Sequence, residues 1–218
     1  MTMKLSKVQS NTRRKWLLAV SLTVIVATCI WAWDSFLEDR IIPKRFGVVE
    51  QGRIYRSGQL SAALIKKVLV KHNIRVIIDL GADDPKNSDK QAEKQAASEL
   101  DIDLLRFPLR GNGTGDVNEY ARAITAIDSA EKNNTPVLVH CSAGTQRTGG
   151  VIAAYRLLKQ KKDPASVINE LKQYDWDPKD NAVLLTYLDD NMPELAMLLK
   201  EKGVIDEIPS PLPKLSQN

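Results

Sequence analysis

Residues 140–149 read His140-Cys141-Ser142-Ala143-Gly144-Thr145-Gln146-Arg147-Thr148-Gly149. The apolar run 136–140 before the loop is typical of a buried strand, and the apolar spacing over 149–160 is typical of a helix. A strand, a tight loop and a helix N-terminus form an anion site, because loop N–H groups converge where the helix dipole is positive. In that field Cys141 is stabilised as a thiolate, and Arg147 can direct two N–H groups at one phosphate. The pattern therefore predicts phosphate binding and nucleophilic attack by sulfur.

The run 140–149 resembles the signature H-C-x5-R-[ST]-G of the cysteine-dependent protein tyrosine and dual-specificity phosphatases. Residues 52–59, with the sequence Gly-Arg-Ile-Tyr-Arg-Ser-Gly-Gln, and the strand end Asp79-Leu80 also resemble the atypical dual-specificity members of this superfamily. The resemblance covers residues 48–199 and is most specific around Cys141. It implies an enzyme that hydrolyses phosphomonoesters through a phosphocysteine intermediate.

The resemblance also implies roles for the residues of the loop. Cys141 is expected to be the nucleophile and Arg147 the phosphate clamp, while the Thr148 hydroxyl bonds the sulfur and assists breakdown of the phosphoenzyme. His140 is expected to order the loop through hydrogen bonds of its ring. The other substrate-binding residues are expected to be Ser142, Ala143, Gly144, Thr145 and Gln146.

The departing oxygen of the substrate needs a proton, which cysteine phosphatases take from an aspartate on a loop upstream of the nucleophile. Asp116 lies 25 residues before Cys141 at the end of a Gly-containing loop, and we expect it to be the general acid. Its alternative role is an N-cap for the following helix. Asp83 and Asp84 are the next candidates for the acid, and Glu119 is disfavoured because it falls inside the predicted helix.

We expect neither a metal ion nor a cofactor. The chain has two histidines, His72 and His140, and neither belongs to a His/Cys/carboxylate cluster at metal-ligand spacing in the sequence. His72, at the end of a predicted helix, is expected to lie on the surface.

Residues 16–33 carry no charge, and as a helix they would be about 27 Å long, close to the thickness of a bilayer core. Trp16, Trp31 and Trp33 stand at the two ends, where interfacial aromatic residues belong. We therefore predict a single-pass membrane anchor; a cleaved signal peptide, or lipidation at Cys29, is the alternative. Basic residues precede the segment in excess, so the N-terminus should be cytoplasmic and the catalytic domain extracytoplasmic. They are Lys4, Lys7, Arg13, Arg14 and Lys15.

The pattern of elements predicts an α/β fold in which a sheet of four or five strands is flanked by helices, preceded by one transmembrane helix. Expected strands are a hairpin within 48–59, then 75–80, 102–107 and 136–140; expected helices are 61–72 capped by Ser61, 88–100 capped by Ser88, 117–131, 149–160, 164–174 and 180–200. The domains are a basic segment 1–15, an anchor 16–33, a linker 34–47, the phosphatase domain 48–200 and a disordered, Pro-containing tail 201–218.

The net charge of +4 gives no case for nucleic-acid binding, because the basic excess lies before Asp34 and the rest of the chain is close to neutral. Expected substrates are a phosphorylated protein, lipid or small molecule. Highly phosphorylated inositols are disfavoured because residues 142–146 include no lysine or arginine, although Arg106 and Arg110 could add charge at the rim. Two rival functions stay open: a non-catalytic phospho-ligand binding module, and other C-x5-R chemistry such as sulfur transfer or arsenate reduction.

Overall fold

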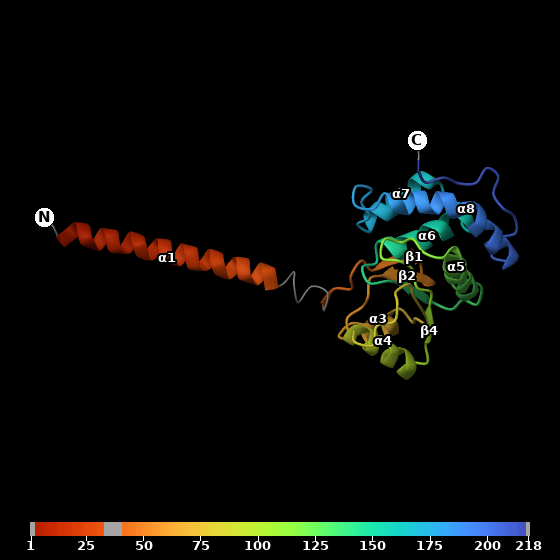
Figure 1. Cartoon of the computed structure of the whole chain (residues 1–218). Helices are drawn as coiled ribbons and strands as arrows, with labels where there is room; N and C mark the ends of the chain where they lie inside the picture. The colour runs from red at the N-terminus through yellow and green to blue at the C-terminus, as the bar shows by residue number, and fades with distance from the viewer. Residues whose placement is uncertain (1–2, 33–40, 217–218) are drawn as a thin grey trace. The chain divides into compact units, whose positions relative to one another are not determined.

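The computed structural model of the chain describes residues 3–32 and 41–216, with side chains over 16–31 and 41–216. The chain divides into two compact units between Ile42 and Pro43. Unit one contains helix α1 (Met3–Ala32), drawn in red in Figure 1, whose described side chains over 16–31 are exposed. No helix, over the residues that the structure describes, combines the length and apolar character of a membrane span. The predicted anchor over 16–33 therefore stays a prediction. Residues 34–40 of the predicted linker, Trp33 and the basic side chains before Trp16 lie outside the described part.

The second unit is built on a five-stranded sheet in the order β1-β2-β5-β3-β4. The strands are β1 (Gly47–Glu50), β2 (Ile54–Ser57), β3 (Val76–Asp79), β4 (Asp103–Arg106) and β5 (Val137–His140). Only β1 runs antiparallel to its neighbour; the other pairings are parallel. This mixed sheet confirms the predicted α/β fold. Because β5 lies between β2 and β3, the loop that follows it emerges at the middle of the sheet, where open α/β sheets bind their ligands.

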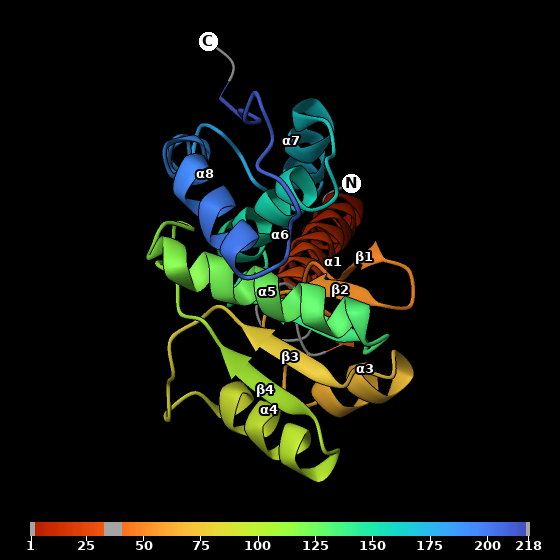
Figure 2. The same ribbon diagram turned by 90° about the vertical axis from the view of Figure 1, so that its right-hand side faces the viewer.

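Helices cover both faces of the sheet (Figure 2). Helices α3 (Ile65–Lys71) and α4 (Ser88–Glu99) lie on one face, and α5 (Val117–Lys132), α6 (Gln146–Leu158), α7 (Pro164–Gln173) and α8 (Val183–Glu201) belong to the other layer. The side chains of β5 alternate between the two cores: Val137 and Val139 pack with α5 and α6, and Leu138 packs with α3. All three are fully buried, as a central parallel strand requires.

The predicted N-cap residues of α3 and α4 were wrong. Ser61 does not cap α3, because residues 62–64 form a turn and Leu64 becomes the N-cap residue without a side-chain bond. The cap of α4 is Asn87, one residue before Ser88, because its side-chain oxygen reaches the N–H groups of Asp89 and Lys90.

The predicted disorder of the C-terminal tail was also wrong for residues 204–216. This segment has no regular secondary structure, as its prolines indicate, but its apolar side chains pack against the domain. Val204 and Leu215 are buried at 2% and 1% exposure in the larger core. The Leu215 and Ser216 N–H groups each donate to the Asp189 carboxylate on α8, both at 2.7 Å. The tail is therefore part of the folded domain.

Candidate active site

The loop between β5 and α6 has its carbonyl groups turned outward. Three donors from neighbouring segments hold the carbonyls of three consecutive loop residues in that orientation. They are the Gln59 N–H to Ser142 O at 3.0 Å, Arg45 Nη1 to Ala143 O at 2.9 Å and Arg56 Nη2 to Gly144 O at 2.8 Å. With the carbonyls engaged outside, the loop presents N–H groups on its inner side; the Gly144 N–H donates to Cys141 Sγ at 3.2 Å. Such a concave set of N–H groups is an anion-binding nest.

Gly144 is required by this loop geometry. Its φ of +81° lies in the left-handed region, and a Cβ placed on it would stand 2.5 Å from the backbone nitrogen of Gly58. The loop and the end of β2 therefore approach backbone to backbone, which only glycine allows.

The environment of Cys141 favours its thiolate. The side chain is 1% exposed, and burial by itself raises the pKa of the thiol. The Thr148 hydroxyl, the Arg147 charge and the N–H groups of Thr148 and Gly144 outweigh burial, so the pKa of Cys141 is lowered. The Thr148 hydroxyl is fully buried, and within the described residues its oxygen has no hydrogen-bond partner of standard geometry. It is nevertheless close enough to the Cys141 sulfur to lower the pKa of the thiol.

Arg147 lies in the first turn of α6, and its charge acts on Cys141. The Thr145 side chain, at the N-cap, makes no capping bond, so the first N–H groups of α6 are left for an anion. The Nε of Arg147 is buried and has no hydrogen-bond partner within the described part of the chain. Its Nη1 lies 3.4 Å from the point where a Cβ on Gly81 would stand. A buried, unpartnered guanidinium donor next to a thiolate is an arrangement that a bound phosphate would complete.

The loop that carries Asp116 lies against the start of α6, directly after the loop that follows β5. A Cβ on Gly113 would stand 3.0 Å from the carbonyl oxygen of Gln146, and Tyr120 Oη donates to the Gly113 carbonyl. Asp116 itself is the N-cap of α5: its Oδ1 accepts from the Asn118 N–H at 2.8 Å and from Asn118 Nδ2 at 3.0 Å. These bonds lower the pKa of Asp116, so it is ionised at neutral pH without ligand.

The alternative acids are engaged elsewhere. Asp83 pairs with Lys94 at 2.9 Å and with Arg106 at 2.9 Å, and the bond from Lys94, together with the charge of Arg106, lowers its pKa. Asp84 accepts from the Lys86 N–H at 3.0 Å. Glu119 lies inside α5 and pairs with Arg122 at 2.7 Å.

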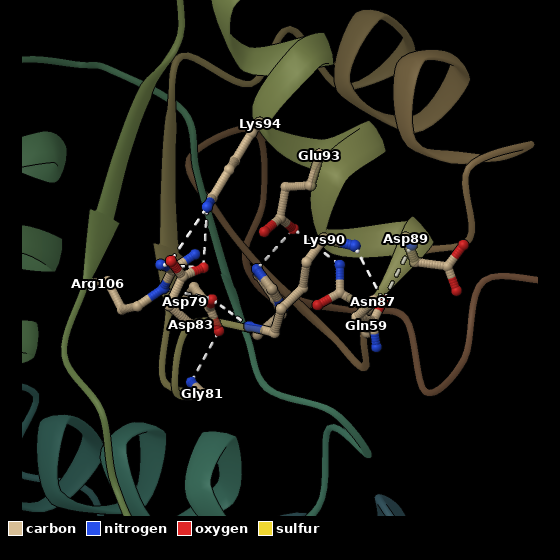
Figure 3. Close-up of polar contacts among 11 residues, drawn as sticks. Gln59, Asp79, Gly81, Asp83, Asn87, Asp89, Lys90, Glu93, Lys94 and Arg106 are labelled. Atoms are coloured by element: carbon tan, nitrogen blue, oxygen red, sulfur yellow. Dashed lines mark hydrogen bonds and ion pairs between the residues drawn. The ribbon is translucent and has the colours of Figure 1, made fainter. Parts of the chain in front are cut away.

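A buried charged cluster lies under the loop, and sequence reasoning missed it. Asp79 at the end of β3, Glu93 on α4 and His140 at the end of β5 bring ligand-type atoms within 4.8 Å of one another. Figure 3 shows Asp79 with Lys90 of α4 and Arg106 of β4, and Glu93 with Gln59. The expectation that no His/carboxylate cluster exists was wrong, because three distant sequence segments converge at one sheet edge. Asp79 already holds two cations of the chain, Lys90 Nζ at 2.6 Å and Arg106 Nε at 3.0 Å. With Lys90 and Arg106 beside Asp79, and His140 beside Glu93, the cluster has no net negative charge for a metal ion.

Two further arginines have roles that the sequence did not reveal. Arg56, 1% exposed, stacks 3.7 Å over the Tyr174 ring while it holds the loop carbonyl of Gly144. Burial lowers its pKa to about 10, so it remains a cation at neutral pH. Arg106, which could have added charge at the rim, is instead paired with Asp79 and Asp83. His72, expected on the surface, is partly buried between the rings of Phe46 and Tyr55.

Comparison with known proteins agrees with this geometry. Residues 38–183 match the family model described as "DSP-PTPase phosphatase fused to NAD+ Kinase". The chain is 35% identical over 71 residues to the dual specificity protein phosphatase OPG106 of vaccinia virus, a match that covers 32% of this chain and 42% of the viral protein. The chain thus spans less than half the length of that curated relative.

Two solved structures share the fold. One is TpbA of P. aeruginosa, 22% identical with a TM-score of 0.57, over 71% of this chain and 89% of that one. The other is the core catalytic domain of the PP-IP phosphatase SIW14 from S. cerevisiae, 21% identical with a TM-score of 0.59, over 75% and 96%.

Proposed function

This chain belongs to the DSP-PTPase family, and from that premise we propose that it is a cysteine-dependent phosphatase, which dephosphorylates phosphotyrosine and phosphoserine or phosphothreonine in proteins through a phosphocysteine on Cys141. The observation that carries the proposal is the buried thiol with a lowered pKa beside an unpartnered guanidinium donor, Arg147 Nε. This pairing supplies the nucleophile and the site for the phosphoryl oxygens together.

In the first step the Cys141 thiolate attacks phosphorus, an S–P bond forms, and the P–O bond to the leaving group breaks. Arg147 and the inward N–H groups of the loop stabilise the charge on the equatorial oxygens during transfer. In the second step water attacks the phosphocysteine, the S–P bond breaks and inorganic phosphate leaves. The Thr148 hydroxyl stabilises the departing thiolate, and its action on Cys141 in the free enzyme supports this role.

Asp116 is proposed to donate the proton to the leaving oxygen and to take one from the attacking water. In the free protein its capping bonds hold it ionised. A phosphate dianion arriving in the adjacent loop raises the pKa of a nearby carboxyl group, because a like charge disfavours ionisation. The contact of its loop with the Gln146 carbonyl supports this assignment.

A single phosphate on a protein is the proposed substrate. The side chains of residues 142–146 are uncharged, and the nearby cations Lys90 and Arg106 are neutralised by carboxylates. Arg147 Nε is a buried donor beside Cys141 that has no partner in the described part of the chain, and we take this arrangement to favour a substrate with a single phosphate. The similarity to the yeast PP-IP phosphatase, at 21% identity, concerns the fold and does not indicate the substrate of this chain.

The test is hydrolysis of aryl and alkyl phosphates by the full chain, with chelator and reductant present. Cys141→Ser should abolish turnover. Asp116→Asn should reduce kcat about 100-fold or more for an alkyl phosphate, and much less for a nitrophenyl ester, whose leaving group needs no proton. Asp163→Asn is the matched control, because Asp163 caps α7 as Asp116 caps α5.

Equal, small losses in the two Asp variants would show that Asp116 only caps its helix. Folded wild-type protein that binds phosphotyrosine peptide without turnover would favour a non-catalytic binding module. Activity that survives in Cys141→Ser would contradict the mechanism.

A further inference from the structure

Glu93 is a carboxylate in the middle of α4 that is 1% exposed, and α4 also buries Lys90, Ala96 and Ala97. Its Oε1 lies 2.9 Å from His140 Nε2, and the His140 side chain is also 1% exposed. A buried carboxylate at this distance from a buried imidazole stabilises the charged form of the ring. The residue that precedes the nucleophile is therefore paired with a group 47 positions earlier in the chain.

Glu93 reaches the phosphate-binding loop by a second route. The same Oε1 accepts a hydrogen bond from Gln59 Nε2 at 3.1 Å, and the Gln59 backbone N–H holds the Ser142 carbonyl at 3.0 Å. One carboxylate thus connects to both sides of Cys141, through His140 before it and through Gln59 to Ser142 after it. Among the described residues, no other side chain pairs with His140 and also accepts a hydrogen bond from Gln59.

The neighbouring cations are paired with other carboxylates, so Glu93 pairs with His140. Asp79, which also faces the ring from β3, is engaged by Lys90 of α4 and Arg106 of β4. Glu93 Oε2 has no hydrogen-bond partner in the described part of the chain, and no cation other than His140 pairs with this carboxylate there. Burial disfavours a charge on the ring, but Glu93, Asp79 and the Cys141 thiolate raise the pKa of His140 to about 9.

We propose that Glu93 is a positioning residue for the phosphatase reaction: it holds His140 as an imidazolium and, through His140 and Gln59, sets the loop that stabilises the Cys141 thiolate. The inference rests on the proposed function for its consequence in catalysis. Its structural part, a charged His140 that favours the thiolate, can be measured without any turnover.

Glu93→Gln is the direct test, because it keeps the shape of the side chain and removes its charge. The rate of Cys141 alkylation by iodoacetamide is followed against pH in the full chain, with the labelled peptides quantified by mass spectrometry. The pKa of Cys141 should rise by about one unit in this variant. The exposed Cys29 gives an internal reference thiol in the same sample. Glu99→Gln, on the same helix but at the surface beside Lys66, should leave both thiols unchanged.

The catalytic consequence is a shift of the acidic limb of kcat/KM toward higher pH by the same amount, with a loss of about 10-fold near neutral pH. An unchanged pKa of Cys141 in folded Glu93→Gln would overturn the proposal. If the shift is present while the wild-type protein hydrolyses no phosphate ester, the positioning role stands and the proposed function fails.

A second measurement needs no substitution at Glu93, so it can be made even if Glu93→Gln does not fold. The chain has two histidines, so His140 can be followed by NMR titration of the ring signals, with His72→Gln used to assign them. His140 should remain protonated through pH 8. A titration at or below the ordinary histidine pKa of 6.5 would contradict the proposal.

Discussion

At the scale of single residues, the site depends on one glycine that brings two backbones together. Gly144 has φ +81° and approaches the Gly58 nitrogen, whereas Gly52 has φ +74° and would meet nothing within 4 Å if it carried a Cβ. The two glycines share the same backbone conformation and differ only in their surroundings, so they form a matched pair.

Gly144→Ala should reduce kcat/KM roughly 100-fold, because a shift of the loop by about 1 Å misplaces the N–H groups and the sulfur. Gly52→Ala should lose about 1–2 kcal/mol of unfolding free energy from the left-handed backbone and keep its activity. Denaturant unfolding and steady-state kinetics on both variants check this. Similar activity in the two variants would show that the close approach of the loop to β2 is not required.

The sequence was sufficient to place the residues that we propose to act on phosphorus in one loop, and insufficient to predict the side chains that contact this loop from other elements. Cys141, Arg147 and Thr148 stand within one local strand–loop–helix pattern, so their spacing alone places them together. Glu93, Asp79 and Arg56 reach the loop from α4, β3 and β2, and no local spacing predicts that meeting. The burial of a charged side chain would have indicated this cluster. Burial of one residue in a helix of mostly polar residues cannot be inferred from the sequence.

At the scale of elements, α8 contacts both the loop that carries Asp116 and the C-terminal tail. Near its start, Leu184 would contact a Cβ on Gly113, and Tyr187 Oη donates to the Gly115 carbonyl at 3.1 Å. Further along, Asp189 receives two N–H groups of the tail. The prolines correctly indicated a segment without helix or strand, but they did not reveal that Leu215 fills a place in the core.

Leu215→Ala should lower the unfolding free energy by about 2–5 kcal/mol, since it removes a side chain that is 1% exposed. Met197→Ala on α8, where the side chain is 48% exposed, should change it by about 0.5 kcal/mol or less. Urea denaturation followed by tryptophan fluorescence gives both values. If Leu215→Ala were as stable as the control, the tail would not be part of the core.

At the scale of the whole molecule, His140 makes stability depend on pH. Folding raises its pKa from 6.5 to about 9, so the folded chain binds this proton more tightly than the unfolded chain. The resulting stabilisation is complete below pH 6.5 and is lost as pH rises through about 9; its upper limit is about 3 kcal/mol. Cys141 acts in the opposite sense, because its pKa is lowered on folding. Cys141→Ser removes this opposing effect, but it also removes the thiolate charge that helps to raise the pKa of His140, so in this variant the stabilisation is lost at a lower pH.

Unfolding free energy of Cys141→Ser, measured by urea titration from pH 6 to pH 10, should therefore fall across this window. The added substitution Glu93→Gln should lower the stability below pH 6.5 and flatten the profile. A flat profile in the single variant would show that His140 is not held as a cation in the folded chain.

The central claim is that phosphate is transferred to Cys141, and trapping the intermediate tests it most directly. Asp116→Asn mixed with a nitrophenyl phosphate should accumulate the phosphoenzyme, because the leaving group needs no acid while hydrolysis by water loses its base. After rapid quenching, peptide mass spectrometry should find the phosphoryl group on Cys141, and none in the additional variant Cys141→Ser. Phosphate on another residue, or turnover by wild-type protein without a covalent intermediate in any variant, would contradict the account.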